Sequence, residues 1–289
     1  MHRTQTIGIV LVASAIFVLS LSGVMVRQMS VDAWTIIFWR SAFMAPVMLL
    51  VITATRKGKI AGAFKEAGMT GFFAGVVIGA GLALYIFSIS RTMVANTVVL
   101  LSSAPLFAAL LGLIILKERV RAGAWITIAV AGYGIVVMFV GRTGAGELTG
   151  NLLAIAAAVL YALNIVLVRT RPHANMIPVV FFAGLTSMAI TFPLADLMNI
   201  AADQLLWLAA MGICQLGFGL VLFTFGAQRL PAAQTAMIAL VEVILAPLWV
   251  WWAISEVPSD PVLVGGAIVL GAVAAHTLLT LRRKPALAN

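Results

Sequence analysis

The sequence predicts an all-α polytopic membrane protein whose ten transmembrane helices form two inverted five-helix repeats. Three observations support this prediction. The 289 residues are 63% hydrophobic and only 9% charged, with a mean hydropathy of +1.14, whereas soluble domains are about 45–50% apolar and about 25% charged. Apolar windows long enough to cross a bilayer follow one another along the chain, and two segments of the first half recur in the second.

Each span needs roughly 20 apolar residues, because a helix rises about 1.5 Å per residue across a hydrocarbon core of about 30 Å. The first half has such windows near 7–26, 34–53, 68–90, 94–115 and 122–140. The second half has them near 149–168, 177–196, 204–227, 233–254 and 260–281. The first window is too long for the apolar region of a signal peptide and lacks a clear cleavage site, so we expect a retained helix.

The charges predict the orientation. If the N-terminus is inside, fourteen loop and tail cations lie on the cytoplasmic side, namely Arg3, Arg56, Lys57, Lys59, Lys65, Lys117, Arg119, Arg121, Arg169, Arg171, Arg229, Arg282, Arg283 and Lys284. The opposite side then has Arg27, Arg91 and Arg142, and Arg40 lies within a span. This positive-inside bias places both termini in the cytoplasm.

The two halves share sequence at fixed offsets. Residues 79–97 and 217–235 are identical at eight of nineteen positions, and the same offset of 138 pairs Glu118 with Glu256. Near the start of each half, an offset of 142 pairs Arg27 with Arg169. Since each half contains an odd number of predicted spans, residues 1–143 and 144–289 are expected to be inverted repeats, an architecture typical of alternating-access transporters.

These features resemble the drug/metabolite transporter superfamily in its ten-helix EamA-type form. That form has a proline in the fourth helix and an acidic residue at its end, here Pro105 and Glu118. Its ninth helix often has a Glu-Pro pair, where this chain has Glu242 followed by Val243, with Pro247 one turn later. The resemblance implies the fold and secondary transport, and the superfamily includes amino-acid exporters.

Composition and motifs exclude several other classes of protein. One cysteine, Cys214, and three histidines leave no Cys- or His-based metal cage, so we expect no metal. The glycine-rich segment 141–146 lacks the Gly-Lys-Ser/Thr ending of a nucleotide loop and is interpreted as a link between the halves. Without a nucleotide motif we expect no cofactor, and transport driven by a gradient. The net charge of +9 is scattered between apolar runs, which is unlike a nucleic-acid-binding surface.

Two charges stand inside predicted spans, and each has two open interpretations. Glu242 is either a proton or cation site, or a carboxyl that hydrogen-bonds a neighbouring helix. Arg40 either binds an anionic group of the substrate or is a structural residue. Small residues Gly71, Gly75 and Gly79 form a stripe that predicts close packing of two helices.

Polar and aromatic side chains within other spans predict a mostly apolar substrate cavity. The candidate substrate-binding residues are Tyr85, Ser102, Ser103, Tyr161, Asn164 and Gln215. Pro105 is expected to break its helix near Leu101. Trp249, Trp251 and Trp252 are expected to belong to an interfacial aromatic belt.

The sequence thus predicts a secondary transporter of a bacterial-type inner membrane that exports small amphipathic metabolites, with amino acids, including aromatic ones, as the first choice. The alternative substrate is a drug-like organic cation exchanged for protons. A membrane-embedded lipid-modifying enzyme is a further alternative, but the chain lacks a cluster of catalytic His, Asp or Cys. The expected partners are the substrate, the bilayer and a coupling proton, without nucleic acid, in a monomer or weak homo-oligomer.

Overall fold

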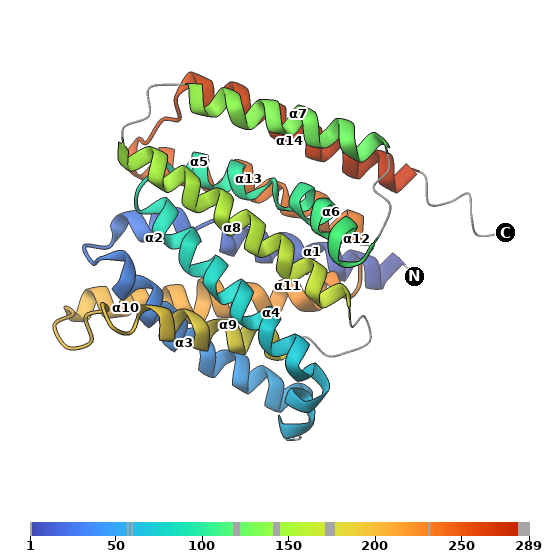
Figure 1. Ribbon diagram of the computed structural model, residues 1–289. Coiled ribbons are helices and arrows are strands. Elements are labelled where there is room, and N and C mark those ends of the chain that lie inside the picture. The colour runs from blue at the N-terminus through green and yellow to red at the C-terminus, as the bar shows by residue number, and fades with distance from the viewer. Residues whose placement is uncertain are drawn as a thin grey trace.

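Helices account for nearly all described residues, and no strand occurs among them (Figure 1). The structure is a computed structural model that describes residues 2–56, 58, 60–117, 122–140, 145–170, 177–230 and 232–282. Glu118, the predicted boundary between residues 143 and 144, and most of the 141–146 link therefore lie outside the described residues. The same is true of seven of the predicted cytoplasmic cations, Lys57, Lys59, Arg119, Arg121, Arg171, Arg283 and Lys284, and of Arg142.

The helices follow one another with short connections. In the first half they are α1 (His2–Leu19), α2 (Ser22–Gln28), α3 (Ala33–Thr55), α4 (Ile60–Ile89), α5 (Val94–Leu101), α6 (Ala104–Ile115) and α7 (Ala122–Val140). In the second half they are α8 (Ala145–Arg169), α9 (Ile177–Thr191), α10 (Ala202–Ala210), the π-helix η1 (Met211–Phe218), α11 (Gly219–Ala227), α12 (Ala232–Ala239), α13 (Val241–Ile254) and α14 (Asp260–Arg282).

The described part of the chain contains seven helices that are long and apolar enough to cross a membrane. They are Thr4–Gln28, Ala33–Thr55, Ile60–Ile89, Val94–Ile115, Gly146–Arg169, Ala202–Ala227 and Met237–Ile254. Three shorter apolar helices accompany them, Trp125–Phe139, Ile177–Thr191 and Asp260–Ala275. The protein is therefore a polytopic helical membrane protein, whereas the count of ten spans and their inverted arrangement stay predictions.

Several of the long helices are interrupted. Ser20 and Leu21 separate α1 from α2, Ser102 and Ser103 separate α5 from α6, and Leu240 separates α12 from α13. The Ser20, Ser102 and Ser103 hydroxyls each donate to the backbone carbonyl three residues earlier, and such local bonds compete with the helical ladder. Pro105 lies in the first turn of α6, where its missing N–H costs no helical hydrogen bond.

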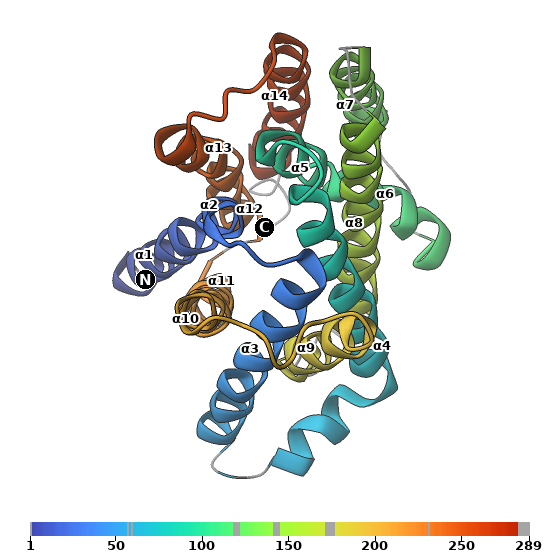
Figure 2. The same cartoon turned by 90° about the vertical axis from the view of Figure 1, so that its left-hand side faces the viewer.

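Helices of one half pack mainly on helices of the other. α4 contacts α8 and α9, α11 contacts α1, α3 contacts α9, and α7 pairs with α14 at one edge of the bundle (Figure 2). The predicted close packing of the glycine stripe is confirmed, because a Cβ at Gly75 would meet Phe182 Cβ at 2.3 Å and one at Gly79 would meet the Ala183 carbonyl oxygen at 2.5 Å.

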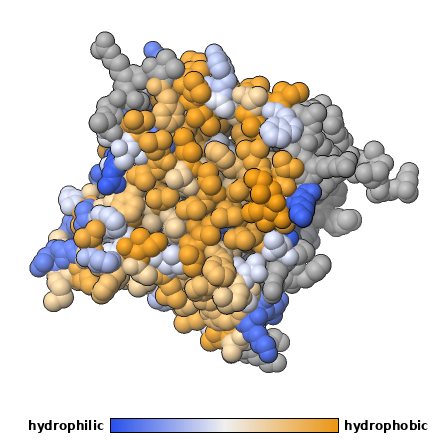
Figure 3. Space-filling view, in the orientation of Figure 1, coloured by the Kyte–Doolittle hydropathy of each residue, from blue (hydrophilic) through white to orange (hydrophobic). Residues whose placement is uncertain are grey.

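The outside of the bundle is apolar. Large hydrophobic side chains such as Leu50, Ile114, Ile126 and Trp252 are more than 60% exposed, and Figure 3 shows hydrophobic residues covering most of the face in view. An exposed apolar surface of this extent suits hydrocarbon rather than water. The residues Arg27, Thr92, Asp196 and Glu256 lie at one end of the bundle, called here the Arg27 face.

Candidate functional site

The break between α1 and α2 is a meeting point for polar side chains of three other helices. The Tyr85 hydroxyl of α4 lies 2.6 Å from the Ser22 hydroxyl, and both residues are buried. The Trp249 indole of α13 donates to the Ser20 hydroxyl at 2.8 Å. The Gln215 amide of η1 donates to the Leu19 carbonyl at 2.9 Å. The last carbonyls of a helix have no partner within that helix, so this bond satisfies one of those at the end of α1.

The π-helix positions Gln215 against this break. π-Helical turns are rare and often occur at functional sites. Gly212 permits a very close approach to α3, since a Cβ there would meet the Arg40 carbonyl oxygen at 2.5 Å. The Gln215 side chain is buried, and its Oε1 has no hydrogen-bond partner in the structure.

Arg40 lies in the same region with few partners. Only 1% of this residue is exposed. Its Nη2 donates to the Leu82 carbonyl across a long 3.4 Å, and its Nε has no partner. Among the described residues, no carboxylate forms an ion pair with Arg40.

Glu242 lies in the first turn of α13, two residues after the break at Leu240. The ion pairs of the described residues do not include Glu242. Three of the candidates converge on one stretch of α4, since Arg40 of α3 donates to the Leu82 carbonyl, Tyr161 of α8 lies against Gly81, and Tyr85 follows about one turn later. Arg40, Tyr85 and Tyr161, with Gln215 and Ser22 at the edge, are called here the polar cluster.

Tyr161 owes its position to a glycine. A Cβ at Gly81 of α4 would meet the Tyr161 ring carbons Cδ2 and Cε2 at 3.1 and 3.2 Å, so the ring lies directly on the α4 backbone. Asn164, three residues further along α8, is half-buried, and its Oδ1 has no partner. Both residues present polar atoms from α8.

Ser102 and Ser103 differ from the other candidate residues in where their hydrogen bonds go. Their hydroxyls donate to the Val99 and Leu100 carbonyls at 2.6 and 2.5 Å, within their own helical segment. The structure therefore gives them a local partner at the α5–α6 break beside Pro105, and it does not join them to the polar cluster by a hydrogen bond.

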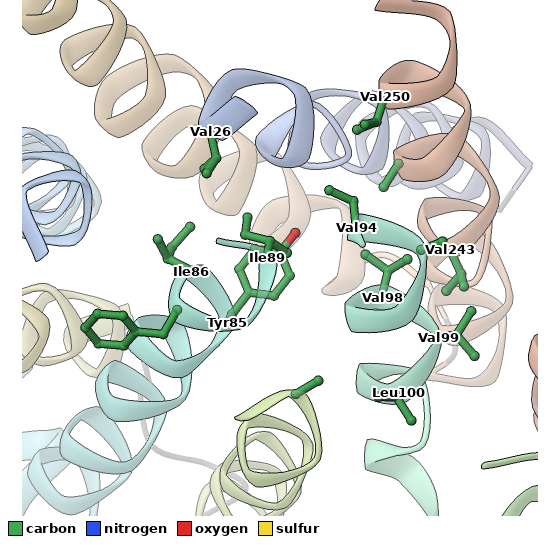
Figure 4. Close-up of a cluster of buried hydrophobic side chains, with 14 of the residues drawn as sticks. Val26, Tyr85, Ile86, Ile89, Val94, Val98, Val99, Leu100, Val243 and Val250 are labelled. Carbon is green, nitrogen blue, oxygen red and sulfur yellow. The ribbon is translucent and has the colours of Figure 1, made fainter. Parts of the chain in front are cut away.

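Apolar side chains separate the polar cluster from the Arg27 face. Figure 4 shows Val26, Ile89, Val94 and Val250 gathered near Tyr85. Gly23 of α2 allows this closure, because a Cβ there would meet Val94 Cγ1 at 2.6 Å and Val250 Cγ2 at 3.3 Å. The helices α2, α5 and α13 thus pack closely together around Gly23.

An ion pair lies beyond that apolar layer. Arg27 Nε is 3.0 Å from Glu256 Oε2, and Arg27 Nη2 donates to the Thr92 carbonyl at 2.8 Å. Glu256 Oε1 accepts from the Val94 amide at 2.8 Å, where an α-helix N-terminus favours negative charge. A pocket of about 530 Å³ opens beside this pair, lined by Val26, Arg27, Asp32, Trp34, Ser90 and Arg91 among others.

Sequence reasoning missed part of the site. Ser20 and Ser22 carried no signal beyond two serines in an apolar window, and the π-helix has no sequence signature. Trp249, expected in an interfacial belt with Trp251 and Trp252, is partly buried and donates to Ser20, whereas Trp251 and Trp252 are 55% and 83% exposed. No group of three or more metal-ligating side chains occurs in the part of the chain that the structure describes.

Known membrane transporters resemble this chain in sequence. A model of the EamA-like transporter family matches residues 6–140 and again residues 148–278. A Pseudomonas aeruginosa protein named pseudopaline exporter CntI is 26% identical over 272 residues, which are 91% of this chain and 93% of that protein. An Archaeoglobus fulgidus protein named uncharacterized transporter is 27% identical over 195 residues, 66% of this chain and 70% of that protein.

The fold also matches a solved structure. One protein crystal structure superposes with a TM-score of 0.66 and covers 96% of this chain and 98% of that one. Its sequence identity is 16%, so the likeness concerns the fold alone.

Proposed function

The chain belongs to the EamA-like transporter family, and from that premise we propose that it exports small amphipathic metabolites, first of all amino acids with apolar or aromatic side chains. Family membership makes the protein a membrane transporter rather than an enzyme. The substrate class, the direction and the mechanism are the proposal.

One observation supports a substrate site above all others, namely the polar cluster. Arg40 and Glu242 are charges within predicted spans, yet neither has an ion-pair partner among the described residues. Isolated charges in a membrane interior are costly and commonly mark a transport pathway. The Tyr161 ring adds an aromatic surface that suits an apolar or aromatic side chain.

Reciprocal contacts between the halves support ten spans in two inverted repeats. Gly81 lies against Tyr161, and their counterparts at offsets 138 and 142, Gly219 and Leu19, also lie against each other, since a Cβ at Gly219 would meet Leu19 Cδ2 at 2.9 Å. In the same way Gly150 lies against Thr92, and Gly8 lies against Leu230. The double match of the family model agrees with residues 1–143 and 144–289 as the two repeats.

Such a repeat allows the polar cluster to face each side of the membrane in turn, when the two halves exchange conformations. Export is supported by the exporter name of the Pseudomonas relative. The bias of loop cations supports a cytoplasmic position for both termini, in the inner membrane of a bacterial-type cell. The Arg27 face is then the external face.

A second candidate substrate is an organic cation exchanged for protons. The observation in its favour is Glu242, a carboxyl within a predicted span that has no ion-pair partner in the described residues. A carboxyl in that position would alternate between binding a proton and binding a cation.

A transport assay in proteoliposomes tests the proposed function. The panel contains the protein amino acids and a set of organic cations, each with and without an imposed pH gradient. We expect saturable transport of apolar or aromatic amino acids. Transport of cations alone would favour the second candidate, and transport of no compound by folded protein would contradict both.

A further inference from the structure

Arg40 is a buried, tightly packed residue whose positive charge has no counterion among the described residues. The close contact of its carbonyl oxygen with Gly212 fixes the α3 backbone against η1, and the residue is 1% exposed. A guanidinium has five N–H donors, but the only hydrogen bond it makes in the structure is the 3.4 Å contact to Leu82, and Nε has no partner. Burying a charge without a partner costs several kcal/mol.

The neighbouring groups have the opposite deficit. Gln215 Oε1 and Asn164 Oδ1 are buried acceptors without a partner, and Glu242 is an acid outside the ion pairs of the described chain. Arg40 therefore lacks an anion, and these acceptors lack a donor. Gln215 belongs to η1, which packs on α3 at Arg40, and Asn164 follows Tyr161 by about one turn of α8.

We propose that Arg40 binds the carboxylate of a zwitterionic amino-acid substrate and that this contact sets substrate specificity. The inference rests on the proposed function and narrows its substrate class. Arginine is suited to the role because its planar fork of donors matches two carboxylate oxygens. A lysine supplies the charge but not the fork.

The test compares each transported amino acid with its decarboxylated amine and its deaminated acid, in wild type, Arg40→Lys and Arg40→Met. The wild type is expected to transport the amino acid at least tenfold faster than the amine. Arg40→Met is expected to lose this discrimination, and Arg40→Lys to retain part of it. A purely structural Arg40 would lower all rates in the same proportion.

The outcomes separate this inference from the proposed function. Equal transport of amino acids and amines by the wild type would contradict the zwitterion site and leave the transporter intact. Unchanged discrimination in Arg40→Met would exclude Arg40 as the carboxylate receptor. Transport of no compound in the panel would contradict both proposals. If Arg40→Met does not fold, the Arg40→Lys variant answers the question by its partial loss.

A different observation supports a second inference. Glu256 uses one carboxylate oxygen on Arg27 and the other on the Val94 amide, so it joins the ends of α2, α5 and α13. The tight Gly23–Val94–Val250 contact lies directly inward of it. The 530 Å³ pocket is lined by Arg27 and Val26, which belong to this closure.

We infer that Arg27 and Glu256, with Thr92 and Val94, form an ionic latch that keeps the polar cluster closed toward the Arg27 face. For the polar cluster to become accessible from the Arg27 face, α2 and α13 must separate. The Arg27–Glu256 ion pair links the ends of these two helices. The pocket is then the vestibule through which substrate leaves once the latch has opened.

Cysteine labelling tests the latch. Cys214 is the only cysteine, so Cys214→Ala provides a cysteine-free chain, and Ser22→Cys places a reporter beside Tyr85, inward of the closure. A charged, membrane-impermeant thiol reagent is applied from the Arg27 face of oriented vesicles. We expect Glu256→Gln to raise the labelling rate at least fivefold and Glu256→Asp to raise it less.

Arg91→Gln is the matched control, because Arg91 lines the same pocket and lies outside the ion pairs of the described chain. It removes one charge without touching the latch and is expected to leave labelling unchanged. Equal labelling rates in wild type, Glu256→Gln and Arg91→Gln would overturn the inference. Glu256→Asp keeps the charge, so it allows the test even if Glu256→Gln is poorly folded.

Discussion

Arg27 and Glu256 lie 229 positions apart in the sequence and 3.0 Å apart in the structure. Their side chains are 25% and 18% exposed, so the pair is partly shielded from solvent and salt. The contact joins the end of the first predicted span to the end of the ninth. Both ends must therefore lie on one side of the membrane, as the predicted orientation requires.

The pair is expected to stabilise the fold as a unit. Arg27→Met and Glu256→Gln should each lower the melting temperature of the detergent-solubilised protein. The double variant should lose less than the sum of the single losses, with a coupling of about 1 kcal/mol. Arg91→Gln again serves as control. Strict additivity would mean that the two side chains do not interact in solution.

Tyr161 is expected to contribute to substrate affinity through its ring. Tyr161→Ala should raise the KM for an aromatic amino acid about fivefold, since an aromatic contact contributes about 1 kcal/mol, while Tyr161→Phe should stay near wild type. Gly81→Ala should act in the same direction, because its Cβ would push the ring from a 3.1 Å contact. Transport kinetics in proteoliposomes measure all three. Wild-type kinetics in Tyr161→Ala would assign the ring to packing alone.

Glu242→Gln separates the two interpretations of this acid. The amide keeps the size and the hydrogen-bonding capacity but cannot ionise. A coupling role therefore predicts loss of pH-gradient-driven transport, while substrate exchange continues. A structural role predicts an unchanged gradient response, and reduced stability in Glu242→Leu. Glu147→Gln, in the first turn of α8, is a control at an acid outside the polar cluster.

Asp196 provides a pH prediction because it lies in the loop between α9, which ends at Thr191, and α10, which begins at Ala202. The Asn199 and Met198 amides donate to its carboxylate and hold its pKa below the ordinary value. Its contribution to loop order is therefore present at neutral pH and lost as the pH falls through this lowered pKa. Amide hydrogen exchange of residues 196–199 should show the loss in wild type. In Asp196→Asn it should be absent, because the amide does not titrate.

Reporter tags test the predicted orientation. Tags at both termini should be cytoplasmic, and a tag inserted after Gly144 should be external, because fourteen cations lie on one predicted side and three on the other. Accessibility to an impermeant reagent in intact cells measures both. An internal tag on the same side as the termini would refute ten spans.

Composition alone predicted the membrane class, because hydrocarbon excludes charge whatever the details of packing. Polar residues within apolar windows also singled out Arg40, Tyr85, Tyr161 and Glu242 as candidates, and their roles in transport stay predictions. The sequence did not reveal how Ser22 meets Tyr85 or why Trp249 turns inward. Those contacts depend on the break at Ser20–Leu21 and on contacts between helices far apart in the chain. Ser102 and Ser103 have partners within their own segment, which residue type alone does not predict.

The π-helix η1 also sets the helical phase of everything that follows it. Gly219 and Gly226 lie on the side of α11 that meets Leu19 and Val12 of α1, with Cβ positions that would fall within 3 Å of those side chains. One residue corresponds to about 100° of rotation in an α-helix. Deleting a single residue from Met211–Phe218 would rotate both glycines away from α1 and bring bulky side chains into their place. This segment should therefore tolerate substitutions far better than a change in length.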